Sequence, residues 1–251
     1  MITLQPATII GGPVSPYVRK VLVACELKGV PYRLDPIVPF FGGDKFSELN
    51  PLRRIPVYID DKVSISDSTV ICEYLEERFS TPRILPLETA QRAQARWIEE
   101  FADTRLGHVS IWRLFYESVI GPLVFQTKRD PDKIAGIVAS EVPDVMTTLE
   151  QLAPAEGFLF DALGVADISV AVFFANLKWS RVELDRTRWP KTLAWVDRTT
   201  ATPALAKVTR IADRLMQVMP DQHRAVLAEM GVALTETTVA AATPRRSPRI
   251  A

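Results

Sequence analysis

The chain has 251 residues, of which 47% are hydrophobic and 24% are charged, and its 30 acidic residues balance 30 basic ones. This length favours two domains, and this composition is that of a soluble globular protein rather than a disordered or membrane one. The zero net charge excludes the positive field expected of a general nucleic-acid binder, and no apolar run is long enough to span a membrane. The N-terminus has no basic segment before its apolar run, which argues against a cleaved signal and predicts a cytoplasmic protein.

The cysteines and histidines are too few and too scattered for a metal centre. The two cysteines, Cys25 and Cys72, stand on apolar helical faces and fit neither a disulfide framework nor a metal cluster. His108 and His223 are the two histidines of the chain. We therefore predict buried, unreactive cysteines and no metal site.

The first predicted elements form a β-α-β unit. Residues 8–11 predict a short strand, and a loop rich in glycine and proline follows it before a helix that ends at Gly29. Pro16 suits the first turn of this helix, which makes Ser15 its natural N-cap. The Ser15 hydroxyl can accept from backbone amides or donate toward a bound anion, and capping is the commoner role of a lone serine.

An apolar connection over residues 39–44 follows the second strand. It contains Phe40 and Phe41 and then two glycines. Apolar residues in a mobile connection suggest the wall of a binding cleft, and a loop packed on the core is an equal alternative. Residues 46–49 then predict a short helix.

The segment over residues 50–79 carries the most informative pattern. Ile55-Pro56 stands between a turn-prone Asn-Pro and an alternating apolar run, so the proline opens a strand. This placement suits a cis prolyl bond that points the backbone groups of Ile55 outward. Asp67 and Ser68 stand where the strand pattern stops and a helical pattern begins, and helix N-termini attract anions.

The remaining sequence changes character after residue 80. Two prolines mark a linker over residues 81–87, and helical patterns without a strand signal fill residues 88–231. One of these helices is predicted over residues 165–178, with Gly164 as its cap and Asp167 in its first turn. From residue 232 to 251, small residues, threonines and arginines predict a flexible basic tail.

The N-terminal motifs together resemble the glutathione-binding half of a cytosolic glutathione transferase. The residues that carry the resemblance are Ser15-Pro16-Tyr17, Ile55-Pro56 and Asp67-Ser68. The resemblance is close over residues 8–80 and extends further only through the hydrophobic pattern and the helix start near Asp167. It implies an α/β plus all-α fold, in which a thioredoxin-like domain (1–80) precedes an all-helical domain (88–231).

The same resemblance implies a role for each motif. Ser15 would donate a hydrogen bond to the glutathione thiolate, the backbone of Ile55 beside Pro56 would bind the cysteinyl part, and Asp67 and Ser68 would hold the γ-glutamyl end. Arg54 is a further candidate for binding an acidic group, with a solvated surface arginine as the alternative. An apolar electrophile would occupy a second site, although such aromatic stripes are more often core. Its predicted residues are Phe40, Phe41, Ile111, Trp112 and Phe115.

Two departures from the family pattern stand in this region. Arg53-Arg54 replaces the Gly-Lys that many members carry before the X-Pro pair, and we expect Arg53 to be a solvated surface residue. Ser15 and Val18 occupy the positions of a Cys-x-x-Cys motif, which excludes intramolecular dithiol chemistry.

The implied function is a detoxifying glutathione transferase. It would act as a homodimer and conjugate glutathione to a small apolar electrophile. Two alternatives remain open: a non-catalytic binding module with the transferase fold, and a glutathione-dependent isomerase, dehalogenase or peroxidase that uses the same thiolate.

Overall fold

The computed structural model describes residues 5–245 of the chain and divides it into two compact units. One unit combines the residues up to Pro82 with those from Lys207 onward, and the other is Arg83–Ala206. The first contains a β-sheet and the second is helical. The predicted thioredoxin-like α/β domain followed by a helical domain is thereby confirmed.

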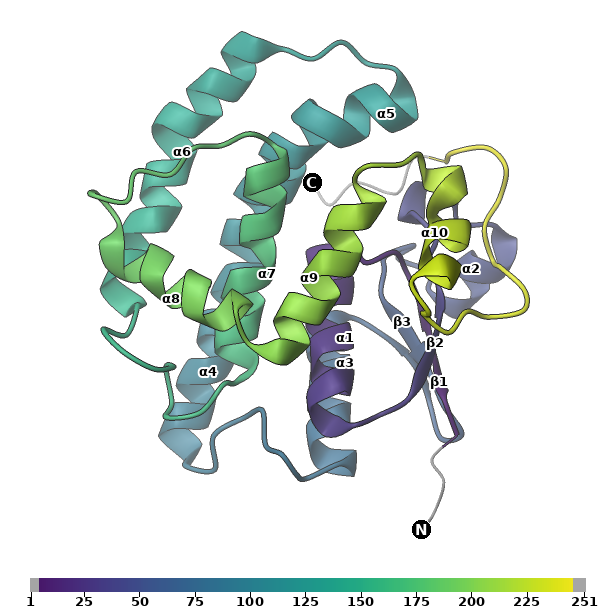
Figure 1. The fold of residues 1–251 in the computed structure, drawn as a ribbon, viewed down its shortest axis with the longest axis horizontal. Helices are drawn as coiled ribbons and strands as arrows, with labels where there is room; N and C mark the ends of the chain where they lie inside the picture. The colour runs from purple at the N-terminus through teal and green to yellow at the C-terminus, as the bar shows by residue number, and fades with distance from the viewer. Residues whose placement is uncertain (1–4, 246–251) are drawn as a thin grey trace. The chain divides into compact units, whose positions relative to one another are not determined.

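The sheet of the first unit has four strands. They are β1 (Ala7–Ile10), β2 (Tyr32–Asp35), β3 (Val57–Ile59) and β4 (Ser64–Ser66), in the order β2-β1-β3-β4. β1 is parallel to β2 and antiparallel to β3, and β4 is antiparallel to β3. Helices α1 (Pro16–Lys28) and α3 (Ser68–Arg78) cover one face, and α2 (Asp44–Leu49) lies on the other (Figure 1).

Helix α1 supplies the crossover that joins the parallel strands β1 and β2. It begins after Ser15 with Pro16 in its first turn, and it ends at Gly29, whose φ of 64° is the left-handed conformation favoured by glycine. Its apolar face, which includes Cys25, is buried. These ends are those predicted from the sequence.

The far ends of α1 and α3 are joined by a buried ion pair. Lys28 Nζ lies 2.8 Å from Glu76 Oε2, and both side chains are almost fully buried. The same ammonium donates to the carbonyls of Phe79 at 2.7 Å and Pro82 at 2.9 Å. Three acceptors therefore satisfy the buried cation, as a charge removed from water requires.

The second unit is an array of helices. They are α4 (Thr89–Phe101), the wide helical stretches η2 (Ala102–Leu106) and η3 (His108–Ile120), α5 (Gly121–Phe125), α6 (Pro131–Leu152), α7 (Val165–Trp179) and α8 (Pro190–Thr200). Pro143 lies inside α6 without dividing it. Helix α7 packs against α4, η2, η3 and α8, so the helix predicted over 165–178 is the core of this unit.

Asp167 holds the start of α7 in place. Its Oδ2 accepts from the Gly164 amide at 3.1 Å, and its Oδ1 accepts from the Trp195 indole at 2.7 Å and from the Leu159 amide at 3.1 Å. Burial raises the pKa of Asp167, and these three donors oppose that rise. The acid thus supplies the half of a capping box that needs no side chain at Gly164.

The C-terminal part of the chain differs from the sequence expectation. Helix α9 (Pro203–Leu215) is followed by η4 (Pro220–Gln222) and α10 (His223–Glu229). The residues from Lys207 onward group with the N-terminal unit, although we expected the helical domain to extend to residue 231. In place of a flexible tail from residue 232, the chain up to Arg245 bonds to the N-terminal unit. Residues 246–251 of the predicted tail lie outside the described residues.

The physical reason for this difference is the unpaired edge of β2. Strand β2 is an outer strand, and the small residues and threonines after Gly231 leave their backbone groups accessible for pairing with it. Between residues 5 and 245, none of the helices combines the length and apolar character that crossing a membrane requires.

Candidate functional site

Ser15 caps α1 as predicted. Its Oγ accepts from the Val18 amide at a long 3.4 Å, and its own amide donates to the Gly12 carbonyl at 3.0 Å. A hydroxyl that accepts one bond keeps its own hydrogen available for donation. The serine is partly exposed at the positive end of the helix dipole. Its position therefore suits both a cap and a donor to an anion.

Arg19 fixes the loop that precedes Ser15, and the sequence analysis missed it. Its side chain is fully buried, and Nη1 donates to the carbonyls of Pro13 and Val14, each at 2.8 Å. Burial lowers the pKa of the Arg19 guanidinium to about 9, and Asp213 opposes this effect, so the group is charged at neutral pH. The sequence signal that could have identified Arg19 as a buried, functional residue is the charged pair Arg19-Lys20 within an otherwise apolar helical face.

The Ile55-Pro56 bond is cis, as its place before β3 predicted. Gly11, at the end of β1, brings this bond close to α1. A Cβ at Gly11 would lie 2.7 Å from Val18 Cγ2 and 2.8 Å from Ile55 Cβ, and the φ of Gly11 is 136°. The start of α1 and the cis-proline segment therefore converge on one glycine.

Arg53 is not the solvated surface residue that we expected. Its Nη2 donates to the Gly42 carbonyl at 2.8 Å, and its Nη1 contacts Ser47 Oγ. Its φ of 53° shows that the arginine itself adopts the left-handed conformation for which the family commonly uses glycine. Arg54 beside it is exposed, and its carbonyl accepts from Asn50 Nδ2 at 2.7 Å.

Asp67 begins α3 in a strained conformation. Its φ is 83°, and its Oδ1 accepts from the amides of Thr69 at 2.9 Å and Val70 at 3.3 Å. Such a backbone conformation costs roughly 1–3 kcal/mol of stability, and residues that adopt it cluster at functional sites. Asp67 is exposed and Ser68 is buried beside it, while Lys20 Nζ from α1 reaches Thr69 Oγ1 at 3.4 Å. The arrangement presents a carboxylate and a helix N-terminus to solvent.

The predicted electrophile residues are divided between the units. Phe40 and Phe41 belong to the first unit, the former buried and the latter half-buried, and the rest belong to the second. Ile111 and Phe115 are buried, and the Phe115 ring lies 6.0 Å from that of Trp179. Trp112 is 44% exposed, which makes it the accessible member of the helical set. The grouping of these residues into one apolar site remains a prediction.

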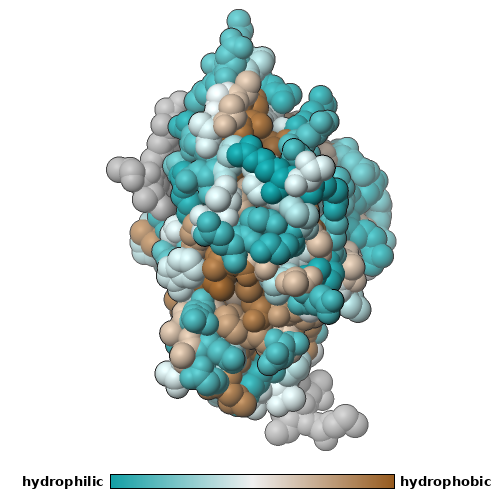
Figure 2. All heavy atoms as spheres, turned by 90° about the vertical axis from the view of Figure 1, so that its left-hand side faces the viewer, coloured by the Kyte–Doolittle hydropathy of each residue, from teal (hydrophilic) through white to brown (hydrophobic). Residues whose placement is uncertain are grey.

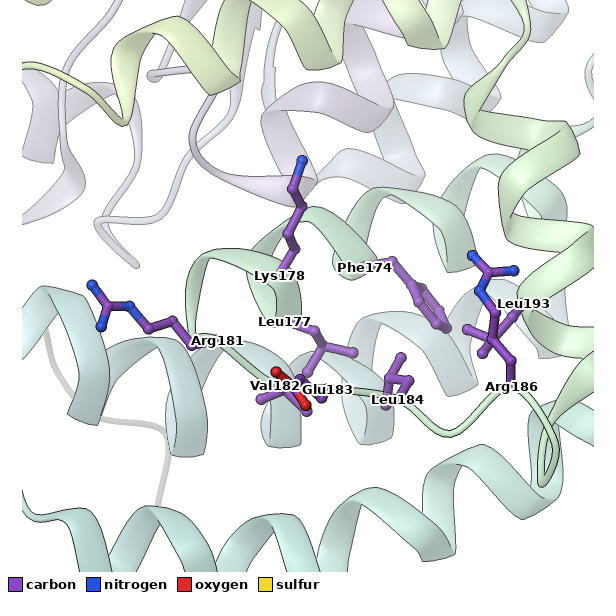
Figure 3. A pocket seen from close by; sticks show the side chains of 9 residues that line it. All are labelled: Phe174, Leu177, Lys178, Arg181, Val182, Glu183, Leu184, Arg186 and Leu193. Atoms are coloured by element: carbon purple, nitrogen blue, oxygen red, sulfur yellow. The ribbon is translucent and has the colours of Figure 1, made fainter.

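A cavity of about 410 Å³ lies elsewhere, at the end of α7 and the loop that leads to α8. Its charged residues include Lys178, Arg181 and Arg186. Figure 3 shows that these three cationic side chains point in different directions, so they do not form a common anion site. None of the predicted site residues lines it. Among the described residues, no group of three or more His, Cys, Asp or Glu side chains is placed to hold a metal ion.

The fold and these motifs define a class of protein. A thioredoxin-like unit with a cis-proline edge and a serine-capped first helix, joined to an all-helical unit, is the architecture of the glutathione transferases. Residues 9–83 match the family model described as the glutathione S-transferase N-terminal domain.

Comparisons with known proteins agree with this class. Over 80 residues the chain is 38% identical to the stringent starvation protein A homolog of Haemophilus ducreyi, which covers 32% of this chain and 37% of that protein. Over 86 residues it is 40% identical to the maleylacetoacetate isomerase of Rattus norvegicus, with 32% of this chain and 40% of that protein covered. The aligned segments thus span well under half of these two curated relatives.

A solved structure extends the likeness to most of the chain. The glutathione S-transferase of Methylobacterium radiotolerans, in complex with glutathione sulfonate, has a TM-score of 0.67 and 25% identity. The match covers 82% of this chain and 95% of that one. Residues 9–83 therefore form a glutathione S-transferase N-terminal domain, and the chain as a whole has the fold of the glutathione transferases.

Proposed function

We propose that this protein is a glutathione transferase that conjugates the glutathione thiolate to a small apolar electrophile. The observation that carries the proposal is the convergence of the Ser15 cap and the cis Ile55-Pro56 bond at Gly11, in the unit whose α3 begins with strained, exposed Asp67. Glutathione is the co-substrate, and detoxification of such electrophiles is the proposed role.

Ser15 would make the sulfur reactive. The thiolate of glutathione is the nucleophile, whereas its thiol form predominates at neutral pH, so the enzyme must lower that pKa and leave the sulfur exposed. The N-terminus of α1 and one hydroxyl donor each contribute about 1 kcal/mol, and about 1.4 kcal/mol corresponds to one pKa unit. A shift of one to two units is therefore within reach of this site.

The other motifs would bind the rest of the tripeptide. The backbone of Ile55, turned outward by Pro56, would pair with the cysteinyl part. Asp67 would attract the γ-glutamyl amino group, while Ser68 and the N-terminus of α3 would hold its carboxylate. Exposed Arg54 lies next to Ile55 and is a candidate for binding the second carboxylate of glutathione.

Calorimetric titration with glutathione, followed by turnover with a panel of electrophiles, tests this proposal. We expect binding and conjugation. A chain that binds no glutathione would instead be a binding module with the transferase fold. Binding without conjugation would point to another glutathione-dependent reaction, such as dehalogenation or peroxide reduction.

Isomerisation is the second candidate function, and the likeness to maleylacetoacetate isomerase favours it. In such a reaction the same thiolate adds to a double bond and leaves again, so glutathione is not consumed. Measuring the glutathione concentration during turnover separates the two reactions, because conjugation consumes one glutathione per product.

We further propose a cytoplasmic homodimer. Exposed apolar side chains support the dimer: Trp97 is 54% exposed and stacks on Phe101, with ring centroids 6.1 Å apart. Figure 2 shows hydrophobic residues gathered at the surface of the face that it draws, framed by hydrophilic ones. Sedimentation should give twice the chain mass of 28.0 kDa, and a monomer at micromolar concentration would contradict the dimer.

A further inference from the structure

The segment over residues 232–245, here called the C-terminal strap, bonds along its length to the N-terminal unit. It begins on the outer strand β2, where the Leu34 amide donates to the Ala233 carbonyl at 2.9 Å and the Thr235 amide donates to the Leu34 carbonyl at 3.2 Å. Figure 1 shows it as the yellow chain that follows α10. The strap thus pairs with an edge that the four-stranded sheet leaves open.

A buried carboxylate fixes the middle of the strap. Asp35, at the end of β2, is 2% exposed, and its Oδ2 accepts from the Val239 amide at 2.8 Å. Arg224 from α10 lies 3.2 Å from the other carboxylate oxygen. The Val239 side chain packs against the apolar cluster of Ile10, Ile37, Phe46 and Val57. A charge–amide bond and an apolar contact therefore hold one point of the strap.

The end of the strap binds the loop over residues 40–44. The Gly43 amide donates to the Val239 carbonyl at 2.8 Å. The amides of Ala241 and Arg245 donate to the carbonyls of Phe41 and Phe40, at 2.5 and 2.6 Å. On its other side, the loop carbonyl of Gly42 accepts from Arg53, two residues before Ile55.

We propose that the C-terminal strap determines which electrophiles the enzyme accepts, by holding the loop of Phe40 and Phe41 in one conformation. This inference rests on the proposed function and on the predicted role of these two rings. The two rings stand at the end of a short 3-10 turn (Pro39–Phe41), and the two glycines that follow it impose little conformation of their own, so the strap and Arg53 hold the glycine part of the loop. Without the strap, the loop gains freedom and the apolar wall becomes less selective.

Two shortened chains test the proposal. A chain that ends at Thr238 loses the bonds made by Val239, Ala241 and Arg245 but keeps the pairing with β2. A chain that ends at Arg245 keeps every bond described above and is the control. Both are compared with the full chain in glutathione affinity and in kcat/KM for electrophiles that share one reactive group and differ in size.

We expect the chain ending at Thr238 to bind glutathione as the full chain does. Its ratio of kcat/KM between bulky and small electrophiles should change by about tenfold or more, the scale on which apolar pockets discriminate by size. The control should keep the ratio of the full chain. An unchanged ratio in the chain ending at Thr238 would overturn the role of the strap.

A second variant keeps the test decisive if that shortened chain fails to fold. Gly43 has a φ of −81°, which proline accepts, and Gly43→Pro removes the amide that donates to Val239. A Cβ at this position would also lie 3.2 Å from the Val239 carbonyl, so the substitution weakens the contact with the strap in both ways. It should shift the electrophile ratio in the same direction, and hydrogen exchange at the amides of Phe41, Gly42 and Asp44 should accelerate in either variant. Unchanged selectivity and exchange would refute the proposal, whereas a full chain that binds no glutathione refutes the proposed function instead.

Discussion

Two aspartates at helix starts, one in each unit, show opposite uses of the same residue. Asp167 is 1% exposed and accepts three hydrogen bonds, including that of the Trp195 indole. Asp67 is exposed, accepts only local amides with one of its oxygens and has a φ of 83°. The first arrangement stabilises a fold, whereas the second leaves a strained, exposed carboxylate, which is what the proposed binding of a ligand requires.

The two aspartates therefore contribute to different properties, Asp167 to the stability of the fold and Asp67 to the proposed binding of glutathione. A buried acid that is fully hydrogen-bonded has no lone pairs to offer a substrate, and its removal leaves several donors unpaired. An exposed acid contributes little to the core, and its second oxygen faces water. Substitutions at the two sites should therefore change different measured quantities.

The largest effect is expected for Asp167→Ala. It leaves the Trp195 indole and the amides of Leu159 and Gly164 without their acceptor. A buried donor left unpaired costs about 1–3 kcal/mol, and the Trp195 indole is the buried one of the three while the two amides are partly buried, so we expect the free energy of unfolding to fall by roughly 3–5 kcal/mol. Urea denaturation measures this loss. Glutathione affinity at low temperature should not change, and a loss below about 1 kcal/mol would contradict the assigned role.

Asp67→Ala should have the next largest effect, mainly on glutathione binding. Loss of a charge-assisted contact with the glutathione amino group should weaken affinity by about ten- to hundredfold, or roughly 1.5–3 kcal/mol. The rate at saturation should change less, because this contact lies far from the reacting sulfur. Calorimetry and steady-state kinetics provide both numbers.

Glu88→Ala is the matched control for Asp67→Ala. Glu88 caps α4 in the other unit, where it accepts from the amides of Ala90 at 2.8 Å and Gln91 at 2.7 Å. Glu88→Ala therefore removes a helix cap comparable to that of Asp67. Both variants lose a helix cap and should be less stable to a similar extent. Only Asp67→Ala should lose glutathione affinity, and equal affinities would remove Asp67 from the binding site.

A smaller effect concerns the pH dependence of stability. His223, at the start of α10, is buried, and burial lowers its pKa below the ordinary value of 6.5. The unfolded chain therefore binds this proton more readily, so stability falls as pH drops from about 6.5 toward the folded pKa. His223→Gln should flatten the unfolding free energy between pH 7.5 and pH 5, and an unchanged pH profile in this variant would contradict the assigned cause.

Local signals made much of the N-terminal unit predictable. Pro16 and Gly29 mark the ends of α1, and the place of Pro56 at a strand start predicted its cis bond. Arg19 and Arg53 were not predictable in this way. Their acceptors are backbone carbonyls, which no residue type reveals, so only the folded loops show where these guanidinium groups bind.

The C-terminal strap was unpredictable for a related reason. Its residues are small and polar, with no apolar periodicity, and the same composition is typical of a disordered tail. The open edge of β2 and the buried carboxylate of Asp35 order the strap, and Asp35 lies 204 positions before Val239 in the chain. A local sequence pattern cannot predict backbone pairing between segments so far apart in the chain.

In the proposed mechanism, Ser15 stabilises the glutathione thiolate in addition to capping α1. The ultraviolet thiolate absorbance of enzyme-bound glutathione, followed against pH for the wild type and for Ser15→Ala, distinguishes the two roles. We expect the pKa of the bound thiol to rise in Ser15→Ala by about one unit for each 1.4 kcal/mol of lost stabilisation, while glutathione affinity is unchanged. If Ser15→Ala lowers stability by the roughly 0.5–2 kcal/mol of a lost cap and the two absorbance curves superimpose, Ser15 is a cap alone and the catalytic claim is wrong.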